Sequence, residues 1–276
     1  MMQQPGTWQA RLMDEEEVAL LGGVANAGAV VRCGAHVLRP SNEHSLSILE
    51  FLSQLEAVGF DGAPSPVALE PDDRERLSFI PGEVAIPPFP TWAQSDEALE
   101  SMAVLIRELH DASELVDTSA KSWSSEMADP EGGPVVCHND VCLENVVFRD
   151  GRAVALLDFD FAAPGRRTFD VAAFARMCVP VDDDVNSAKL GWRPADRPGR
   201  LRLVCDAYGL DADDRAEVLH SLNAAIATGG EFVRRHAEAD EPGFVKMWAE
   251  IGGMERFDRR RRWWAEARRQ FGAALL

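Results

Sequence analysis

Short apolar runs separated by glycine-rich turns fill the first 80 residues, which predicts a small region rich in β-strands. Three such runs, VALLGGV, AVVRC and HVLRP, lie between residues 18 and 40, and two more, SPVALE and ERLSFI, lie between residues 65 and 80. The glycine and asparagine residues between the runs favour turns. Between the two groups the period changes, because four apolar residues fall on one helical face: Ile48, Phe51, Leu52 and Leu55. This pattern predicts a helix over residues 45–58.

A proline-rich stretch at residues 81–90 separates this region from a mainly helical remainder. Because proline cannot continue the interior of a sheet, we place the boundary between two lobes in this stretch. A helix over residues 95–110 is predicted by an apolar seam at helical spacing: Leu99, Met102, Ile106 and Leu109. Short extended segments follow up to residue 160, and the pattern after Thr168 is helical to the end of the chain.

This order of elements predicts an α+β fold with two lobes rather than alternating strands and helices. We expect an N-terminal lobe over residues 1–80 and a C-terminal lobe over residues 81–276. The hinge between them is expected at about residues 78–90. Within the larger lobe, the sequence RDGR at residues 149–152 predicts a hairpin turn between two strands.

The formal net charge of the 276-residue chain is −18. Nucleic acids and anionic membranes both attract basic surfaces, so this charge argues against either as a partner. No apolar run is long enough to span a membrane, the N-terminus lacks a signal-peptide pattern, and the five cysteines are scattered. We therefore expect a cytoplasmic protein. The basic run at residues 256–269 contains two tryptophans and interspersed acids, which favours an amphipathic closing helix over a nucleic-acid site.

The chemically informative segment runs from His138 to Asp170 and contains three polar residues in a suggestive order. Asp140 and Asn145 are five residues apart on a loop that leads into the predicted hairpin, and Asp158 ends the second strand of that hairpin. Because a hairpin brings its two ends together, Asn145 and Asp158 are expected to be neighbours. An amide oxygen beside a carboxylate suits Mg²⁺. Asp140 lies just outside that pair, where it could accept a proton from a hydroxyl that attacks a phosphate.

The order H-x-D-x4-N, hairpin, D-F, followed by the run from Gly165 to Asp170, resembles the aminoglycoside phosphotransferase and choline kinase-like family. That resemblance implies a protein-kinase-like fold, a nucleotide substrate (ATP, or GTP) and Mg²⁺. It implies that Asp140 is the catalytic aspartate and that Asn145 and Asp158 hold the metal. It further implies that His138 packs the catalytic loop and that Asp170 braces this loop by accepting backbone hydrogen bonds.

The resemblance also implies nucleotide contacts in the N-terminal lobe. Backbone groups of Ser78, Phe79 and Ile80 would meet the adenine, and a loop containing Gly22, Gly23 and Gly28 would cover the phosphates, although these glycines also suit ordinary hairpin turns. No lysine precedes Lys121, so the strand lysine of kinases has no counterpart, and Arg39 is the best substitute as a phosphate ligand. Its acidic partner is expected on the following helix, with Glu50 and Glu43 both open.

The acceptor is expected to be a small cationic molecule, because residues 81–248 carry 16 basic and 30 acidic side chains. Candidate acceptor contacts are Asp160, Asp182, Asp183, Asp184 and Glu231, of which Asp182 to Asp184 would form an electrostatic lip. The alternative for each is a solvated acidic residue. Asp160 could also touch a second metal.

These observations predict a small-molecule O-phosphotransferase that acts on a hydroxyl of a cationic compound, such as an aminoglycoside or another basic antibiotic, and so confers resistance. One alternative is a metabolic kinase of a small, choline-like alcohol. A second alternative, kept open by the missing strand lysine, is a non-catalytic kinase-like binding or immunity protein that sequesters a toxic compound.

Overall fold

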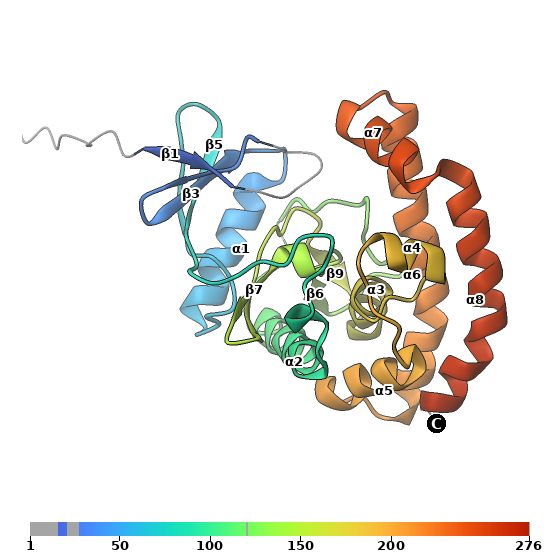
Figure 1. Cartoon of the computed structure of the whole chain (residues 1–276). Coiled ribbons are helices and arrows are strands. Elements are labelled where there is room, and N and C mark those ends of the chain that lie inside the picture. The colour runs from blue at the N-terminus through green and yellow to red at the C-terminus, as the bar shows by residue number, and fades with distance from the viewer. Residues whose placement is uncertain (1–15, 21–27, 120, 276) are drawn as a thin grey trace, which may run out of the picture.

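A five-stranded antiparallel sheet forms the N-terminal region, with the strand order β1-β2-β3-β5-β4 (Figure 1). The structure is a computed structural model and describes residues 16–20, 28–119 and 121–275. The strands are β1 (Glu17–Ala19), β2 (Val31–Cys33), β3 (His36–Pro40), β4 (Pro66–Leu69) and β5 (Arg74–Ser78). The apolar runs predicted as strands therefore form this sheet, apart from residues 21–24 of the first run, which lie outside the described residues. The pairing of β3 with β5 places Arg39 opposite Glu75.

The helix α1 (Ser45–Ala57) joins this sheet to the rest of the molecule (Figure 1). All four residues of its predicted apolar face are buried. The ring of Phe51 lies 5.4 Å from that of Trp123 and 6.5 Å from that of Phe159, both of which belong to the C-terminal region. A single core therefore runs from α1 into the larger part of the chain.

Seven helices make up most of the C-terminal region within residues 96–275. They are α2 (Asp96–Ser113), α3 (Arg167–Cys178), α4 (Asp184–Lys189), α5 (Arg197–Tyr208), α6 (Ala212–Glu238), α7 (Pro242–Ile251) and α8 (Gly253–Leu275). The seam predicted on α2 is buried along its whole length. The helix begins at Ser95, whose hydroxyl accepts a hydrogen bond from the backbone N–H of Ala98. On α8, Trp264 and Phe271 are buried, as expected for a closing helix.

Two small two-stranded sheets lie between the N-terminal sheet and the helices. One pairs β6 (Val135–Cys137) with β9 (Ala163–Gly165), and the other pairs β7 (Val146–Arg149) with β8 (Arg152–Leu156). The turn between β7 and β8 consists of Asp150 and Gly151, whose φ angles are 51° and 76°. A two-residue hairpin turn requires such left-handed angles, which explains the Asp-Gly sequence.

The architecture confirms the predicted α+β fold, with a small antiparallel sheet on one side and a larger helical part on the other (Figure 1). Glu83, near the start of the proline-rich stretch, pairs with Phe148 of β7. The chain is therefore already part of the larger region at residue 83. The lobe boundaries at residues 80 and 81 remain a prediction. Within the described residues, no helix combines the length and the apolar character needed to cross a membrane.

Candidate active site

Asp140 and Asn145 lie on the loop between β6 and β7, and Asp158, which follows β8, lies close to them. The backbone N–H of Leu157 donates to the carbonyl oxygen of Asn145 at 2.8 Å, so the residue before Asp158 lies beside Asn145, as the hairpin predicts. The side-chain Nδ2 of Asn145 donates to the Asp140 carbonyl oxygen at 2.9 Å and to Asp140 Oδ2 at 3.0 Å. Asn145 is therefore the centre of this group and holds the carboxylate of Asp140 in place.

The oxygen atoms left at this centre fit a divalent cation such as Mg²⁺. Because Nδ2 of Asn145 donates twice to Asp140, the Oδ1 atom of the same amide is left as a possible ligand. One oxygen of Asp158 accepts a hydrogen bond from Arg39, and the Asp158 side chain is 42% exposed, so its second oxygen can be reached. One amide oxygen and one carboxylate oxygen are the hard donors that Mg²⁺ takes while keeping several waters.

The carboxyl group of Asp140 titrates near neutrality. Burial first, and then the neighbouring charge of Asp158, raise its pKa to about 7, although the guanidinium of Arg176 and the hydrogen bond from Asn145 act in the opposite direction. A carboxylate with a pKa near 7 is well matched to accept a proton from a hydroxyl group at neutral pH.

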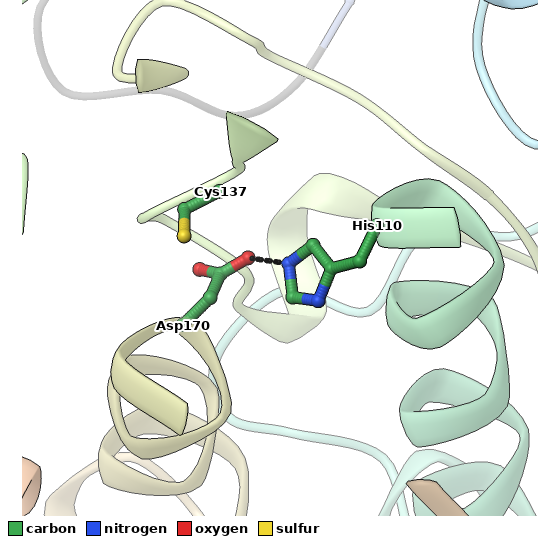
Figure 2. Close-up of side chains that lie close together, drawn as sticks. All are labelled: His110, Cys137 and Asp170. Carbon is green, nitrogen blue, oxygen red and sulfur yellow. Dashed lines mark hydrogen bonds and ion pairs between the residues drawn. The ribbon is translucent and has the colours of Figure 1, made fainter. Parts of the chain in front are cut away.

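Asp170 braces the start of the catalytic loop from the helix α3. Its Oδ2 atom accepts the backbone N–H of His138 at 2.8 Å, and its Oδ1 atom accepts the backbone N–H of Asn139 at 2.8 Å. Figure 2 shows the carboxylate turned toward His110 of α2, whose Nε2 lies 2.9 Å from Oδ2. These contacts are the ones that the resemblance implied for Asp170.

Cys137 lies next to this pair, so the three side chains form a cluster of groups that could in principle bind a metal (Figure 2). Burial raises the pKa of the Cys137 thiol well above its usual range, and the thiol donates to the Arg166 carbonyl oxygen at 3.3 Å. The second ring nitrogen of His110 is 2.7 Å from the hydroxyl of Tyr208. Each polar group already has a protein partner, so the cluster is a structural brace and not a metal centre.

His138 packs the loop, in agreement with the prediction. Its Nε2 atom is 2.9 Å from the Leu157 carbonyl oxygen, and its ring lies 4.7 Å from that of Phe159. Complete burial lowers its pKa, so the ring is neutral at pH 7. His138 therefore ties the catalytic loop to the strand that precedes Asp158.

The guanidinium of Arg39 reaches from β3 to three carboxylates. Its Nε donates to Glu75 at 2.5 Å, Nη1 donates to Asp158 at 2.9 Å, and Nη2 donates to Asp160. The expected partner on the following helix was wrong. The carboxylate comes instead from the neighbouring strand β5, while Glu50 pairs with Lys121 at 2.8 Å.

Glu43, the other residue considered as a partner of Arg39, has an exposed side chain near His44. Asp160, in contrast, is held in the ion pair with Arg39 and is not a solvated turn residue. Burial raises the pKa of the Asp160 carboxyl, and the cation of Arg39 opposes this shift.

The other residues expected to contact the nucleotide are the glycines of the first turn and residues 78–80. Gly22 and Gly23 lie outside the described residues, and Gly28 lies in a turn with a φ angle of 81°. The backbone N–H groups of Ser78 and Phe79 donate to carbonyl oxygens within the N-terminal sheet region. Of the three hinge residues, Ile80 is thus the one whose N–H makes no hydrogen bond within the described part of the chain.

The predicted acidic lip does not form, because its carboxylates are used inside the protein. Asp182 and Asp183 are buried and pair with arginines of α8, Arg256 and Arg259 respectively. Asp183 also begins α4 by accepting two backbone N–H groups. The other two candidates pair with neighbouring cations on the surface: Asp184 with Arg197, and Glu231 with Arg234.

Two groups near the site were not predicted from the sequence. Phe161, which follows Asp160 by one residue, packs against Phe232 of α6, and Phe232 packs against Phe244 of α7. The second is Arg176 of α3, a buried cation beside Asp140. Neither belongs to a local motif, because each depends on how helices far apart in the sequence pack together.

Comparison with known proteins agrees with this geometry. The family model described as "Phosphotransferase enzyme family" matches residues 114–204, which include the catalytic loop and Asp170. The trifolitoxin immunity protein of Rhizobium leguminosarum bv. trifolii is 31% identical over 243 residues, covering 85% of this chain and 90% of that protein.

Solved structures show the same fold at low sequence identity. A choline/ethanolamine kinase family protein from Mesorhizobium loti aligns with a TM-score of 0.61 and 16% identity, covering 94% of this chain and 92% of that one. The gentamicin complex of APH(2")-IIa aligns with a TM-score of 0.58 and 14% identity, covering 87% of this chain and 92% of that one.

Proposed function

The chain belongs to the aminoglycoside phosphotransferase and choline kinase-like family, and we propose that it transfers the γ-phosphoryl group of ATP to a hydroxyl of a small cationic molecule. The observation that carries this proposal is the grouping of Asp140, Asn145 and Asp158. The Asn145 amide donates to Asp140, and the backbone bond from Leu157 to Asn145 brings Asp158 beside them. GTP is the alternative phosphoryl donor.

Each residue of this group has a distinct role in the proposed reaction. The acceptor hydroxyl gives its proton to Asp140, and its oxygen forms a bond to the γ-phosphorus. The bond between that phosphorus and the β–γ bridging oxygen breaks, and the nucleoside diphosphate leaves. Asn145 orients the Asp140 carboxylate, and Arg39 lies where it can bind phosphate oxygens. Asn145 Oδ1 and Asp158 would hold Mg²⁺, which neutralises phosphate charge when bound.

A cationic acceptor is supported by the side chains around Phe232. Its ring packs against Phe161 and Phe244 and also contacts the ring of His236. Aromatic faces attract organic cations. We place this reaction in the cytoplasm, where thiols remain reduced, because Cys137, Cys142, Cys178 and Cys205 are buried thiols.

The relative named as an immunity protein favours a toxic compound as the acceptor. Phosphorylation would add negative charge to that compound and change its binding to a target. The same relative favours a second candidate, a protein that sequesters the compound without chemistry. The ion pairs of Arg39 with Asp158 and Asp160 also suit this candidate, because they balance charge at the site in the protein alone.

Replacement of Asp140 separates these two candidates. Purified wild-type protein is incubated with γ-labelled ATP or GTP, Mg²⁺ and a panel of aminoglycosides, other basic antibiotics and small amino alcohols. Asp140→Ala is expected to abolish phosphoryl transfer while nucleotide still binds, because the proton acceptor is lost and the phosphate contacts remain. Asp150→Asn, in the exposed hairpin turn, is the matched carboxylate control and should keep full turnover. Full turnover in Asp140→Ala, or no transfer by the wild type to any acceptor, rejects the enzyme assignment.

A further inference from the structure

A buried arginine without a partner lies in the middle of the helix α3. Arg176 is 9% exposed, and its Nε atom has no hydrogen-bond partner. Its guanidinium makes no ion pair within 4.0 Å to any carboxylate of the residues that the structure describes. Burial of an unpaired cation is costly, because the group loses its hydration and gains no replacement.

The neighbouring helix leaves space for this guanidinium. Gly229 of α6 faces Arg176, and a Cβ atom at that position would lie 2.5 Å from Nη1 and 2.9 Å from Cζ. Any other residue at position 229 would collide with the guanidinium. The glycine therefore allows the arginine to lie between α3 and α6 rather than at the surface.

Arg176 lies among charges of both signs. Asp140 and Asp182 act favourably on its guanidinium, and Arg256 acts against it. Arg256 and Arg260 of α8 pair with Asp182 at 2.7 Å and 3.6 Å, and Arg260 also donates two hydrogen bonds to the carbonyl oxygen of Val181. Of these three arginines, Arg176 is the one that makes no hydrogen bond or ion pair with the residues that the structure describes.

Arg176 is also next to the catalytic loop. Two residues farther along α3, the thiol of Cys178 donates to the carbonyl oxygen of Val141 at 3.7 Å, which joins this end of the helix to the residue after Asp140. Asp140 exerts the largest favourable charge on Arg176, and Arg176 exerts the largest favourable charge on Asp140. The helices α3 and α6 come from the helical part, on the side of the loop away from the N-terminal sheet (Figure 1).

We propose that Arg176 binds a carboxylate group of the phosphoryl acceptor. This inference rests on the proposed function, which makes Asp140 the base for the acceptor hydroxyl. The planar guanidinium matches a carboxylate with two parallel hydrogen bonds. Together with the aromatic rings around Phe232, the site then suits a zwitterion, such as a hydroxyl-bearing amino acid or peptide, in place of a purely cationic compound.

A binding experiment without nucleotide tests this inference separately from catalysis. N-acetyl-L-serine, its carboxamide N-acetyl-L-serinamide and inorganic phosphate are titrated into the full-length protein and followed by calorimetry. The carboxylate is expected to bind about tenfold more tightly than the carboxamide, and Arg176→Met should remove this preference. Arg261→Met removes an exposed arginine of α8 and should leave the preference unchanged. Equal binding of carboxylate and carboxamide, no binding of either, or a preference that survives in Arg176→Met overturns the proposal.

The phosphate titration distinguishes the other source of an oxyanion. If inorganic phosphate binds through Arg176 and N-acetyl-L-serine does not, the site takes the transferred phosphoryl group and the acceptor carboxylate is rejected. If the carboxylate binds through Arg176 and the wild type transfers phosphate to no acceptor, the proposed enzyme function fails and the anion site stands.

Thermal unfolding shows whether Arg176 is instead a structural arginine. Arg176→Met should melt at or above the wild-type temperature, because it removes an unpaired buried charge. Arg260→Met is the matched control and should melt lower, because it abandons the Val181 carbonyl oxygen and Asp182. If Arg176→Met melts as low as Arg260→Met, the arginine is needed for folding and the proposal is overturned.

Discussion

At the scale of single residues, the pairing of Arg39 with Glu75 should dominate the stability of the N-terminal sheet. Glu75 is fully buried. Its Oε2 atom accepts a hydrogen bond from Arg39, and its Oε1 atom has no hydrogen-bond partner. Arg39→Met should therefore destabilise the protein by about 3–5 kcal/mol, since it leaves a buried carboxylate unpaired. The double variant Arg39→Met/Glu75→Leu should recover most of this loss, because the lone charge is gone. Urea unfolding of the three proteins measures both effects, and a double variant as unstable as Arg39→Met would contradict the assignment.

The same residue shows what the sequence could and could not predict. Arg39 was identified by elimination, because no lysine precedes Lys121. Its partner could not be identified in that way, because Glu75 is 36 positions away and meets Arg39 only through the register of β3 and β5. Strand register depends on long-range pairing that no local spacing encodes.

His236 gives the pH dependence of stability at this scale. Burial lowers its pKa, but the carboxylates of Glu241 and Glu126 outweigh that effect and raise it above the usual 6.5. The protonated ring is therefore stabilised by folding. This contribution is complete below pH 6.5 and is lost as the pH rises through the higher value in the folded protein. Thermal unfolding of wild type and His236→Asn should differ most at pH 5.5 and converge by pH 9, and a gap that widens with pH would reject this explanation.

At the scale of elements, the first turn of α3 fixes the catalytic loop through Asp170. Asp170→Ala removes the acceptor for the backbone N–H groups of His138 and Asn139 and for His110, and all of these groups are buried. The expected loss is about 3–5 kcal/mol in the free energy of unfolding by urea, with a smaller loss for Asp170→Asn, which keeps one acceptor oxygen. Asp111→Ala removes an exposed partner of Arg167 and should cost less than about 1 kcal/mol. Equal losses in Asp170→Ala and Asp111→Ala would show that the brace does not hold the loop.

Elements with strong local signals were predicted well. The spacing of apolar residues located α1 and α2 within a few residues, and the Asp-Gly pair located the hairpin of β7 and β8. The acidic run at residues 182–184 was misassigned, because Asp182 and Asp183 pair with arginines more than 70 positions later on α8 and Asp184 pairs with Arg197. Charge counted along the sequence does not show which charges are already paired in the fold.

At the scale of the whole molecule, the net charge of −18 does not identify the acceptor, although the excess of acidic residues in 81–248 suggested a cationic one. The acidic residues expected to form a lip are paired, and one arginine without a hydrogen-bond partner at Nε, Arg176, lies beside Asp140. Under the proposals made above, selectivity for the acceptor would depend on a few buried groups rather than on the overall field. The aromatic rings around Phe232 and the guanidinium of Arg176 would then be the groups at which that selectivity can be changed.

The two regions of the molecule should unfold together, because α1 of the smaller region is part of the core of the larger one. Phe51 has no exposed surface and packs against Phe159 and Trp123. Phe51→Ala should lower the free energy of unfolding by about 3–5 kcal/mol. Scanning calorimetry should show a single transition in both proteins, shifted as a whole in the variant.

The control lies on the same helix. Leu46 is 70% exposed, so Leu46→Ala should change the free energy of unfolding by no more than about 0.5 kcal/mol. Two resolved transitions in the wild type, or a loss in Phe51→Ala confined to one of two transitions, would show that the lobes fold independently. In that case the ion pairs from Arg39 to Asp158 and Asp160 would act as a contact between two separate folding units. A single transition would instead show that the common core fixes the position of β3 relative to the catalytic loop. Arg39 would then be held at the proposed nucleotide site by packing as well as by charge.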